Sequence, residues 1–288
     1  LESGNLKHGR DFYLCFSPER IDPGNHKYTL SKIPKLIGGI TPEATALGAL
    51  VYSSIIHDLV PVSSTRVAET AKLLENTFRI VNIGLIDEIA MMAHKMNINI
   101  WEVIEAARTK PFGFMPFYPG PGVGGHCIPK DPLYLYWKAK KFGFKSRFIK
   151  LASEIINHMP VYVVNCVRDI FIQRGLRLDG AKILVIGVTY KKDVKDLRKS
   201  PGLDIIEILE RNHALVYYHD PLIPFLKLNH INLKSIEINS KSLPSFDCAV
   251  IVADHSSLDY SLILKKSRLI FDTRNVYKDI TNRKISRL

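Results

Sequence analysis

Residues Thr65–Met96 read TRVAETAKLLENTFRIVNIGLIDEIAMMAHKM, a stretch with no proline and a single glycine. Because Ser63 or Ser64 can cap its start, the stretch predicts one continuous α-helix, roughly 48 Å long. Apolar residues recur along one stripe at spacings of three and four: Val67, Ala71, Leu74, Phe78, Val81, Leu85, Ile89 and Met92. Further apolar residues lie outside that stripe: Leu73, Ile80, Ile83 and Ile86. Since more than one face requires burial, we expect the helix to connect domains and to form a homodimer interface through the second face.

Apolar runs of strand length flank this helix on both sides. Before it, the runs are Asp11–Ser17, interpreted as a buried strand, then Lys35–Ile40 and His57–Val62. A helix is predicted from Pro42 to about Ser54. After the long helix, the runs are Lys182–Val188, Leu215–His219, Cys248–Ala253 and Leu269–Asp272. A helical pattern at Asp204–Arg211 separates the first two of these runs, which favours a parallel sheet.

The chain is therefore predicted to be an α/β protein in three parts. Residues 1–62 are interpreted as the C-terminal remnant of an N-terminal Rossmann-like domain, because a complete doubly wound domain needs more βα units. Residues 63–158 form a central helical region with one long helix. Residues 159–288 form a C-terminal Rossmann-like, parallel-sheet domain, entered by a helix that ends at Gly175. The sequence starts without methionine, so we expect it to begin partway into a longer protein.

The composition is typical of a folded globular protein, with 46% apolar residues, 24% charged residues and a net charge of +12. The basic residues are scattered without a run of five or six, so no nucleic-acid-binding arm is predicted. The excess charge fits either an anionic small molecule or a generally lysine-rich organism. No apolar stretch reaches the ~20 residues of a membrane span, and no signal peptide is predicted, so the expected location is cytoplasmic. The cysteines form no CxxC pair, so no metal site is expected.

Residues Pro119–Pro132, PGPGVGGHCIPKDP, are interpreted as a loop that lies against a ligand. The glycines at 120, 122, 124 and 125 let backbone approach closely, and the prolines are expected to prevent a helix. Cys127, with Asp131 four residues later, is a candidate nucleophile beside a carboxylate that holds water. The alternative, a buried structural cysteine, fits the other three thiols: Cys15, Cys166 and Cys248. The glycine pattern superficially matches a dinucleotide fingerprint, but no strand precedes it and no helix is expected after it, so the cofactor-binding residues stay unknown.

Two further groups of residues could bind negative charge. Lys72 and Asn76 are four residues apart on the long helix and would share one face, as an oxyanion site requires, although a solvated lysine is the commoner explanation. The segment Lys191–Arg198, KKDVKDLR, precedes Ser200 and Pro201, which are typical of an N-cap and a first helical residue. Cations beside a helix N-terminus suit a diphosphate, and an exposed charged loop is the alternative.

Four blocks of sequence resemble one known family. They are Ser17–Gly24 (SPERIDPG), Ala71–Asn76 (AKLLEN), Gly122–Asp131 (GVGGHCIPKD) and Tyr190–Asp193 (YKKD) with Asp196 and Arg198. In this order and spacing, from about Asp11 to the end of the chain, they resemble the UDP-glucose/GDP-mannose dehydrogenases. Those enzymes use NAD to oxidise the C6 alcohol of a nucleotide sugar to a carboxylate. The PERxxPG form of the first block, with Lys110–Phe114 and Asp254–Ser256, looks most like the subgroup that acts on UDP-N-acetylhexosamines for surface polysaccharides.

The resemblance implies a role for each matched residue. Cys127 would attack the C6 aldehyde, and the resulting thiohemiacetal would be oxidised to a thioester that water hydrolyses. The other catalytic residues implied are Lys72 and Asn76 at the oxyanions, Asp131 at a proton carrier, and Glu19 at the sugar and hydrolytic water. The substrate-binding residues implied are Gly122, Gly124, Gly125, Lys191, Arg198 and Arg274. Lys191 would hold the diphosphate, and Arg274 would lie near the sugar nucleotide or the cofactor.

Two departures bear on the substrate. Pro23 stands where UDP-glucose enzymes have a second glutamate, and Pro111, next to Lys110, stands where many members place an arginine from the dimer partner. Both changes fit a UDP-N-acetylhexosamine better than UDP-glucose. Two alternatives remain open: a UDP-glucose 6-dehydrogenase, and a truncated, non-catalytic module that binds a UDP-sugar and dimerises. The expected cofactor is NAD, and the expected partners are the sugar nucleotide and a second copy of the chain.

Overall fold

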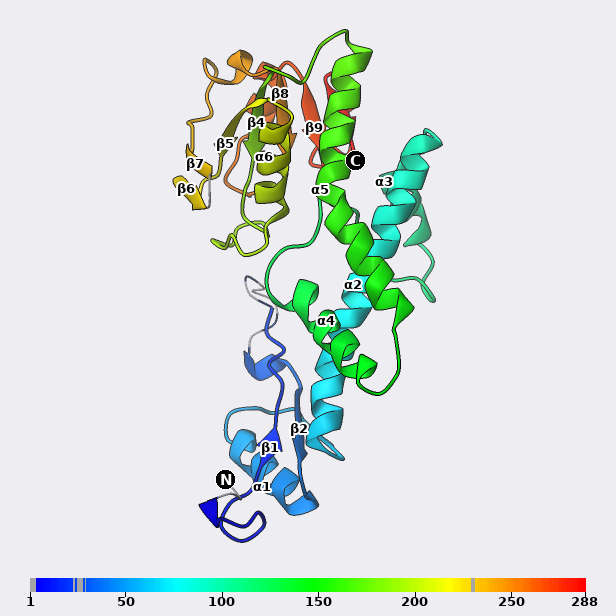
Figure 1. The fold of residues 1–288 in the computed structure, drawn as a ribbon, viewed down its shortest axis with the longest axis vertical. Coiled ribbons are helices and arrows are strands. Elements are labelled where there is room, and N and C mark those ends of the chain that lie inside the picture. Colours follow the sequence, from blue (N-terminus) through cyan, green and yellow to red (C-terminus); the bar gives the residue numbers. More distant parts are fainter. Residues whose placement is uncertain (1–3, 23, 25–27, 29, 229–230) are drawn as a thin grey trace.

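A computed structural model describes residues 4–22, 24, 28, 30–228 and 231–288. The chain is elongated, with a small N-terminal sheet at one end and the C-terminal sheet at the other (Figure 1). Long helices lie between the two sheets and join them. The predicted α/β fold class, with its helical middle and its parallel C-terminal sheet, is confirmed.

The N-terminal part is a three-stranded sheet with one helix. Its elements are β1 (Cys15–Phe16), a 3₁₀ turn (Leu30–Lys32), β2 (Lys35–Gly39), α1 (Pro42–Ser53) and β3 (Leu59–Val62). The strand order is β1-β2-β3, with β1 antiparallel and β3 parallel to β2. The prediction of a buried strand over Asp11–Ser17 was wrong in extent and burial, because only Cys15 and Phe16 pair with β2 and Leu14 stays exposed. As an edge strand with one neighbour, β1 lacks the cover that a buried strand needs.

The central part contains the predicted long helix. The helix α2 runs from Thr65 to Lys95, and the Ser64 side chain accepts a hydrogen bond from Val67 N at its start. The other central elements are α3 (Ile100–Ala107), α4 (Cys127–Lys140) and α5 (Arg147–Gln173). Both α4 and α5 pack on α2. Gly175, with φ of +68°, follows the end of α5, as predicted. The proposed boundary between residues 158 and 159 lies inside α5, so this one helix belongs to both parts.

The buried face of α2 differs from the predicted apolar stripe. The residues of α2 that are buried are Ala68, Asn76, Ile80, Gly84, Asp87, Ala90 and Ala93. At Gly84, an added Cβ would lie 3.0 Å from Ala152 Cα, so the absence of a side chain lets α5 approach closely. Most of the predicted stripe is exposed instead, at Val67, Leu74, Phe78, Leu85 and Met92. Ile83 and Ile86, expected on the unpartnered face, are half-buried. The close contact between α2 and α5 is made by small residues. The periodicity of large apolar residues therefore predicted the wrong buried face of α2.

The helix α4 begins inside the segment that was predicted to be loop. Cys127 is its first residue, so the expectation that Pro129 and Pro132 prevent a helix was wrong. Pro129 lies in the first turn, where backbone N–H groups have no partner within the helix, so proline costs little there. Pro132 lies farther inside, where it removes a helical hydrogen bond, and it is buried against the rest of the chain. The glycine-rich segment therefore does lead directly into a helix.

The C-terminal part is a five-stranded parallel sheet with helices on its two faces. Its strands are β4 (Lys182–Ile186), β5 (Leu215–His219), β8 (Cys248–Ile251), β9 (Ile270–Asp272) and β10 (Ile285–Arg287), in the order β10-β9-β8-β4-β5. A separate hairpin comprises β6 (Phe225–Leu228) and β7 (Ile231–Lys234). One face packs on α5 and α6 (Pro201–Arg211), and the other on a 3₁₀ turn (Leu243–Ser245) and α7 (Tyr260–Lys266). Within the described residues, no helix has the length and apolar character to cross a membrane.

The strand order places a topological switch point between β4 and β8. From β4, the chain passes to β5 on one side and later returns to β8 on the other. In open α/β sheets, ligands bind outside the carboxyl ends of the strands at such a point. The segments that leave these two ends are 187–199, after β4, and 252–256, after β8. Lys191–Arg198 therefore lies where the fold itself favours a binding site.

Candidate active site

Cys127 presents an exposed thiol at the first turn of α4. Two other cysteines, Cys166 and Cys248, are buried, as predicted, and burial raises the pKa of their thiols to about 11 and about 12. Cys15, which was also predicted to be buried, is only half-buried, because it lies on the edge strand β1. Among the described thiols, Cys127 is the one placed to react.

Asp131 and Asn76 meet between α4 and α2. The Asn76 amide donates a hydrogen bond of 2.6 Å from Nδ2 to Asp131 Oδ2, although the residues are 55 positions apart in the sequence. Asn76 is buried, and Asp131 lies one helical turn after Cys127. Lys72, half-buried, lies one turn before Asn76 on α2. The structure thus brings Asn76, one member of the oxyanion pair predicted on α2, into contact with the helix that carries the candidate nucleophile.

The glycine-rich loop packs on the C-terminal part of its own chain. A Cβ added at Gly124 would lie 2.5 Å from Tyr190 Cβ and 2.6 Å from Lys199 O, and one added at Gly125 would lie 3.0 Å from the Tyr190 ring. Gly125 N also donates a hydrogen bond of 2.7 Å to Arg198 O. At Gly122, with φ of +128°, the neighbour would be Pro201, the first residue of α6. These glycines are therefore required by a contact between protein segments, where the sequence had suggested a contact with ligand.

A buried carboxyl group that the sequence analysis missed holds the start of this loop. Asp87 on α2 is fully buried, and its Oδ1 accepts a hydrogen bond of 3.0 Å from Gly120 N. Burial raises its pKa to about 8, against the Gly120 hydrogen bond and the Arg274 charge, which both lower it. Arg274 Nη1 lies 2.9 Å from where a Gly120 Cβ would be, and Arg274 Nε donates to Val252 O. The sequence did contain a signal for this residue: Asp87 lies on the same face of α2 as the apolar residues Ile80 and Ala90.

The predicted anion site contains carboxylates as well as cations. Lys191 Nζ lies 2.7 Å from Asp22 Oδ1, and the Arg198 guanidinium binds Asp196 at 2.6 Å. Hydrogen bonds and the charge of Asp196 raise the pKa of Arg198. Arg198 ends the predicted diphosphate segment, and its backbone carbonyl accepts from Gly125 N, two residues before Cys127.

Glu19 has its contacts within the N-terminal part. Its Oε1 accepts hydrogen bonds from Arg20 N and Ile21 N, and its Oε2 lies 3.6 Å from Lys35 Nζ. Partial burial alone would raise the pKa of Glu19, but these hydrogen bonds and the Lys35 charge outweigh it and lower the pKa. The structure does not record a contact between Glu19 and Cys127 within the described residues. Pro23, the nearby departure from the UDP-glucose pattern, lies outside the described residues.

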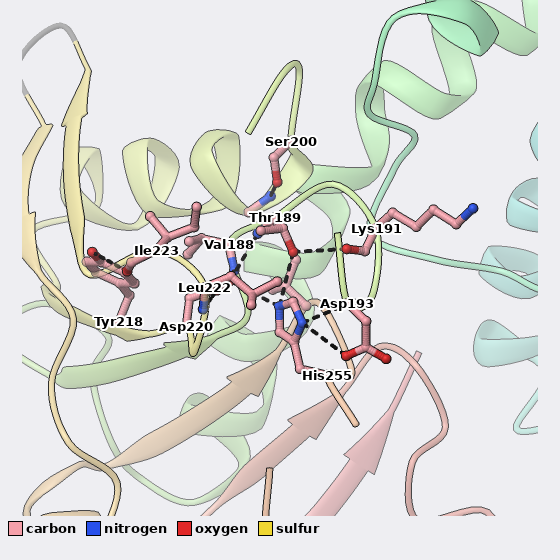
Figure 2. Close-up of polar contacts among 12 residues, drawn as sticks. Val188, Thr189, Lys191, Asp193, Ser200, Tyr218, Asp220, Leu222, Ile223 and His255 are labelled. Carbon is pink, nitrogen blue, oxygen red and sulfur yellow. Dashed lines mark hydrogen bonds and ion pairs between the residues drawn. The ribbon is translucent and has the colours of Figure 1, made fainter. Parts of the chain in front are cut away.

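The turn after β4 does not fit a dinucleotide phosphate. A phosphate at this position would need the N–H groups of the turn, but Val188 N and Thr189 N both donate to Asp220 Oδ2, at 2.7 and 3.2 Å. A Cβ added at Gly187 would lie 2.3 Å from Ala253 O, so the space left by this glycine is filled by backbone. Asp220 and the adjacent His255 are buried, and Figure 2 shows them at the centre of one polar network. Sequence reasoning missed both residues as members of the site.

Comparisons with known proteins agree with this architecture. Residues 66–158 match the central domain of the UDP-glucose/GDP-mannose dehydrogenase family, and residues 184–279 match the UDP binding domain of the same family. The first range holds Cys127, Asp131 and Asn76, and the second holds Arg198 and His255. The two matched ranges together span more than half of the chain.

Individual relatives carry related names. The chain is 34% identical over 280 residues to a UDP-N-acetyl-D-mannosamine dehydrogenase of Pyrococcus horikoshii, covering 95% of this chain and 64% of the relative. It is 36% identical over 252 residues to a UDP-N-acetyl-D-glucosamine 6-dehydrogenase of Pseudomonas aeruginosa, covering 87% of this chain and 59% of the relative. It thus spans about three fifths of the length of these curated relatives.

A solved structure extends the likeness to three dimensions. The UDP-D-ManNAc dehydrogenase structure from Pyrococcus horikoshii superposes with a TM-score of 0.86 at 32% identity, covering 98% of this chain and 66% of that one. The match includes the central helices as well as the C-terminal sheet, since nearly the whole chain is aligned. The chain belongs to the UDP-glucose/GDP-mannose dehydrogenase family.

Proposed function

We propose that the protein oxidises the C6 hydroxyl of a UDP-N-acetylhexosamine to a carboxylate, in the biosynthesis of surface polysaccharide. One observation carries the proposal: an exposed cysteine opens α4, and Asp131 one turn later is fixed by Asn76 from α2. The relatives named above act on UDP-N-acetylhexosamines according to their names, which supports this substrate class over UDP-glucose. UDP-N-acetylmannosamine and UDP-N-acetylglucosamine are both candidates.

The residues of this chain would act on the C6 carbonyl carbon. Cys127 Sγ would bond to this carbon as the carbonyl π electrons move to oxygen. The Lys72 ammonium and the Asn76 amide would stabilise the resulting oxyanion, which is the charge that such donors bind most strongly. Asn76 keeps one N–H beyond the hydrogen bond it gives to Asp131. Asp131 would hold the water or proton carrier, with Glu19 at the sugar.

Substrate binding is proposed to use the surface between the loop and the C-terminal part. Lys191 would hold the diphosphate, exchanging its present partner Asp22 for phosphate oxygens. Arg198 lies on the same segment. The glycines at 122, 124 and 125 and the Arg274 guanidinium would shape the floor of this surface. NAD would accept the hydrides, and the described residues contain no loop that fits it. A homodimer through α2 and a cytoplasmic location remain predictions.

The deciding experiment is turnover by the full-length product of the gene, assayed with NAD and a panel of UDP-sugars. We expect carboxylate product from a UDP-N-acetylhexosamine, and little from UDP-glucose. Cys127→Ser should stop the reaction at the aldehyde level, because a hydroxyl ionises far less readily than a thiol. Cys166→Ser is the matched control, since that thiol is buried on α5 in the hydrophobic core of the C-terminal part.

Two further measurements separate the proposal from its alternatives. Mass spectrometry of the Cys127 peptide after one turnover should show a covalent sugar adduct. Lys72→Ala should slow the reaction by about 10²–10³, the usual cost of one oxyanion donor. Binding of UDP-sugars without any turnover would contradict the oxidation and support a non-catalytic binding module. Carboxylate formation by Cys127→Ser at the wild-type rate would refute the nucleophile assignment.

A further inference from the structure

A fully buried histidine holds the turn that carries Lys191. His255 follows β8, and its Nδ1 lies 3.1 Å from Asp193 N, which donates to it. Its Nε2 lies 3.1 Å from Asp220 Oδ2 and 3.0 Å from Thr189 Oγ1. Thr189 Oγ1 in turn donates to Lys191 O at 3.0 Å. The imidazole therefore contacts both ends of the 189–193 turn directly, and its middle through one hydroxyl (Figure 2).

These contacts are satisfied together by one arrangement of protons. Nδ1 must be the unprotonated nitrogen, because the Asp193 backbone N–H points at it. Nε2 then carries the proton and donates to Asp220 or Thr189. Burial alone would raise the pKa of Asp220, but hydrogen bonds from His255, Val188 N and Leu222 N outweigh it and lower the pKa. A charged Asp220 and a neutral Nε2–H imidazole thus satisfy each other in the interior.

A second set of hydrogen bonds joins the 189–193 turn to the segment after β8, with the Asp193 side chain as acceptor. The Asp193 carboxylate accepts a hydrogen bond of 2.8 Å from Ser256 N and one of 2.7 Å from Ser256 Oγ. Asp193 also has φ of +58°, a left-handed conformation that L-residues adopt at some cost. The reciprocal pairing of residues 193 with 255 and 256 supplies the interactions that hold this conformation in place.

The position of this turn matters for both halves of the candidate site. Gly124 and Gly125 pack against Tyr190, which lies inside the turn. The Lys191 side chain extends away from the polar network (Figure 2), and its Nζ lies 2.7 Å from Asp22 Oδ1 in the N-terminal part. A shift of the turn would therefore move the proposed diphosphate contact and the support of the loop that leads to Cys127.

We propose that His255, as the neutral Nε2–H tautomer, is a positioning residue that fixes the 189–193 turn and thereby sets Lys191 for the diphosphate of the substrate. The part that concerns the diphosphate rests on the proposed function. The part that concerns the turn stands on the ligand-free geometry alone. His255 touches no substrate in this scheme and acts through the backbone of the turn.

Two substitutions separate the two sides of the imidazole. In His255→Asn, the amide oxygen falls near the position of Nδ1 and can still accept from Asp193 N. In His255→Gln, the amide reaches the position of Nε2 and leaves Asp193 N without its acceptor. We expect His255→Gln to be the more damaging variant. His213→Asn is the control. His213 is an exposed histidine that precedes β5, at the amino ends of the parallel strands, whereas His255 follows β8, at their carboxyl ends.

The first measurement needs neither a variant nor a ligand. Imidazole ¹⁵N shifts of the wild-type protein near pH 7 should show His255 as the Nε2–H tautomer. An Nδ1–H tautomer or an imidazolium would overturn the proposal. Amide hydrogen exchange of Asp193 should then be about tenfold faster in His255→Gln, the scale of one lost hydrogen bond, and close to wild type in His213→Asn. Unchanged exchange in His255→Gln would equally overturn it.

The second measurement is calorimetric titration with UDP. We expect His255→Gln to weaken UDP binding about tenfold, with a smaller loss in His255→Asn. Faster exchange with unchanged UDP affinity would overturn the link from His255 to the diphosphate. A wild-type protein that binds no UDP, with the expected tautomer and exchange, would refute the proposed function while supporting the positioning of the turn. The two failures are therefore distinguishable.

Discussion

Replacing Asp87 with asparagine should make the central helices more stable at alkaline pH. The carboxyl group is fully buried, Oδ1 accepts from Gly120 N, and Oδ2 has no hydrogen-bond partner among the described residues. Burial raises the pKa of Asp87 from 3.8 to about 8. The folded protein therefore keeps a proton on this group at pH values where the unfolded chain has lost it.

The sign and size of the effect follow from proton linkage. Between about pH 4 and pH 8 the folded state binds more protons, so the free energy of unfolding falls as pH rises. The slope from one such group is about 1.4 kcal/mol per pH unit, or on the order of 5 kcal/mol across the window. Asparagine has no charge to desolvate, so Asp87→Asn removes this slope. Its amide nitrogen lacks an acceptor at the Oδ2 position, which costs about 1–3 kcal/mol. The variant should thus gain about 2–4 kcal/mol over wild type at pH 8.

Urea unfolding followed by tryptophan fluorescence measures this difference in the relevant part of the chain. The two tryptophans, Trp101 and Trp137, lie on α3 and α4 of the central region. Titrations at intervals from pH 5 to pH 8.5 should give a falling stability for wild type and a flatter profile for Asp87→Asn. Glu88→Gln is the matched control, because it removes one carboxylate from the exposed side of the same helix. Parallel profiles for wild type and Asp87→Asn would refute the reasoning.

Three other predictions test packing, assembly and thiol reactivity. Gly84→Val should lower the stability of the central helices by about 2 kcal/mol, because its side chain would meet Ala152 where α5 crosses, and an unchanged melting temperature would contradict this contact. Leu85→Glu should convert a homodimer to monomer in light scattering, since Leu85 is exposed on α2, and a wild-type monomer at micromolar concentration would contradict the dimer. Iodoacetamide near neutral pH should modify Cys127 before the two buried cysteines, and equal labelling in peptide mapping would contradict its exposure.

The sequence allowed accurate prediction of elements whose signals are local. The helix over Thr65–Met96 and the strand Leu215–His219 match α2 and β5 closely, because Ser64 caps the start of α2 and Pro221 follows the end of β5. Ser200 and Pro201 begin α6 as predicted, and the Ser200 side chain accepts from Gly202 N. The start of α4 could not be predicted in this way. Its first turn tolerates Pro129, and the burial that holds Pro132 depends on distant segments.

The buried face of α2 shows the limit of hydrophobic periodicity. Periodicity gives weight to large apolar residues, but α5 packs closely on α2 through Gly84 and Ala152. Two polar residues, Asn76 and Asp87, are also on the buried side, because each has a partner on the loop or on α4. A helix with two apolar faces leaves open which face its own chain covers. The predicted homodimer would bury the large side chains that are exposed on the other face.

The candidate site was predictable where its geometry is local. Cys127 and Asp131, and likewise Lys72 and Asn76, are one turn apart on a helix, so their spacing fixes their relation. The hydrogen bond between Asn76 and Asp131 joins two such pairs across 55 residues, and no spacing predicts it. His255 had only its resemblance to the subgroup as a signal. Its role depends on three segments that converge at the switch point of the sheet.

The glycine-rich loop connects the candidate nucleophile to the part of the chain that matches the UDP binding domain. Gly124 is confined between Tyr190 Cβ and Lys199 O, neither of which can move without moving its backbone. Gly125 N is hydrogen-bonded to Arg198 O, and Cys127 follows two residues later. A displacement of the 190–199 segment would therefore also move the first turn of α4, because Gly124 and Gly125 are closely packed against that segment. A ligand that orders this segment would order the thiol at the same time, and the glycines that the sequence assigned to ligand contact serve this coupling.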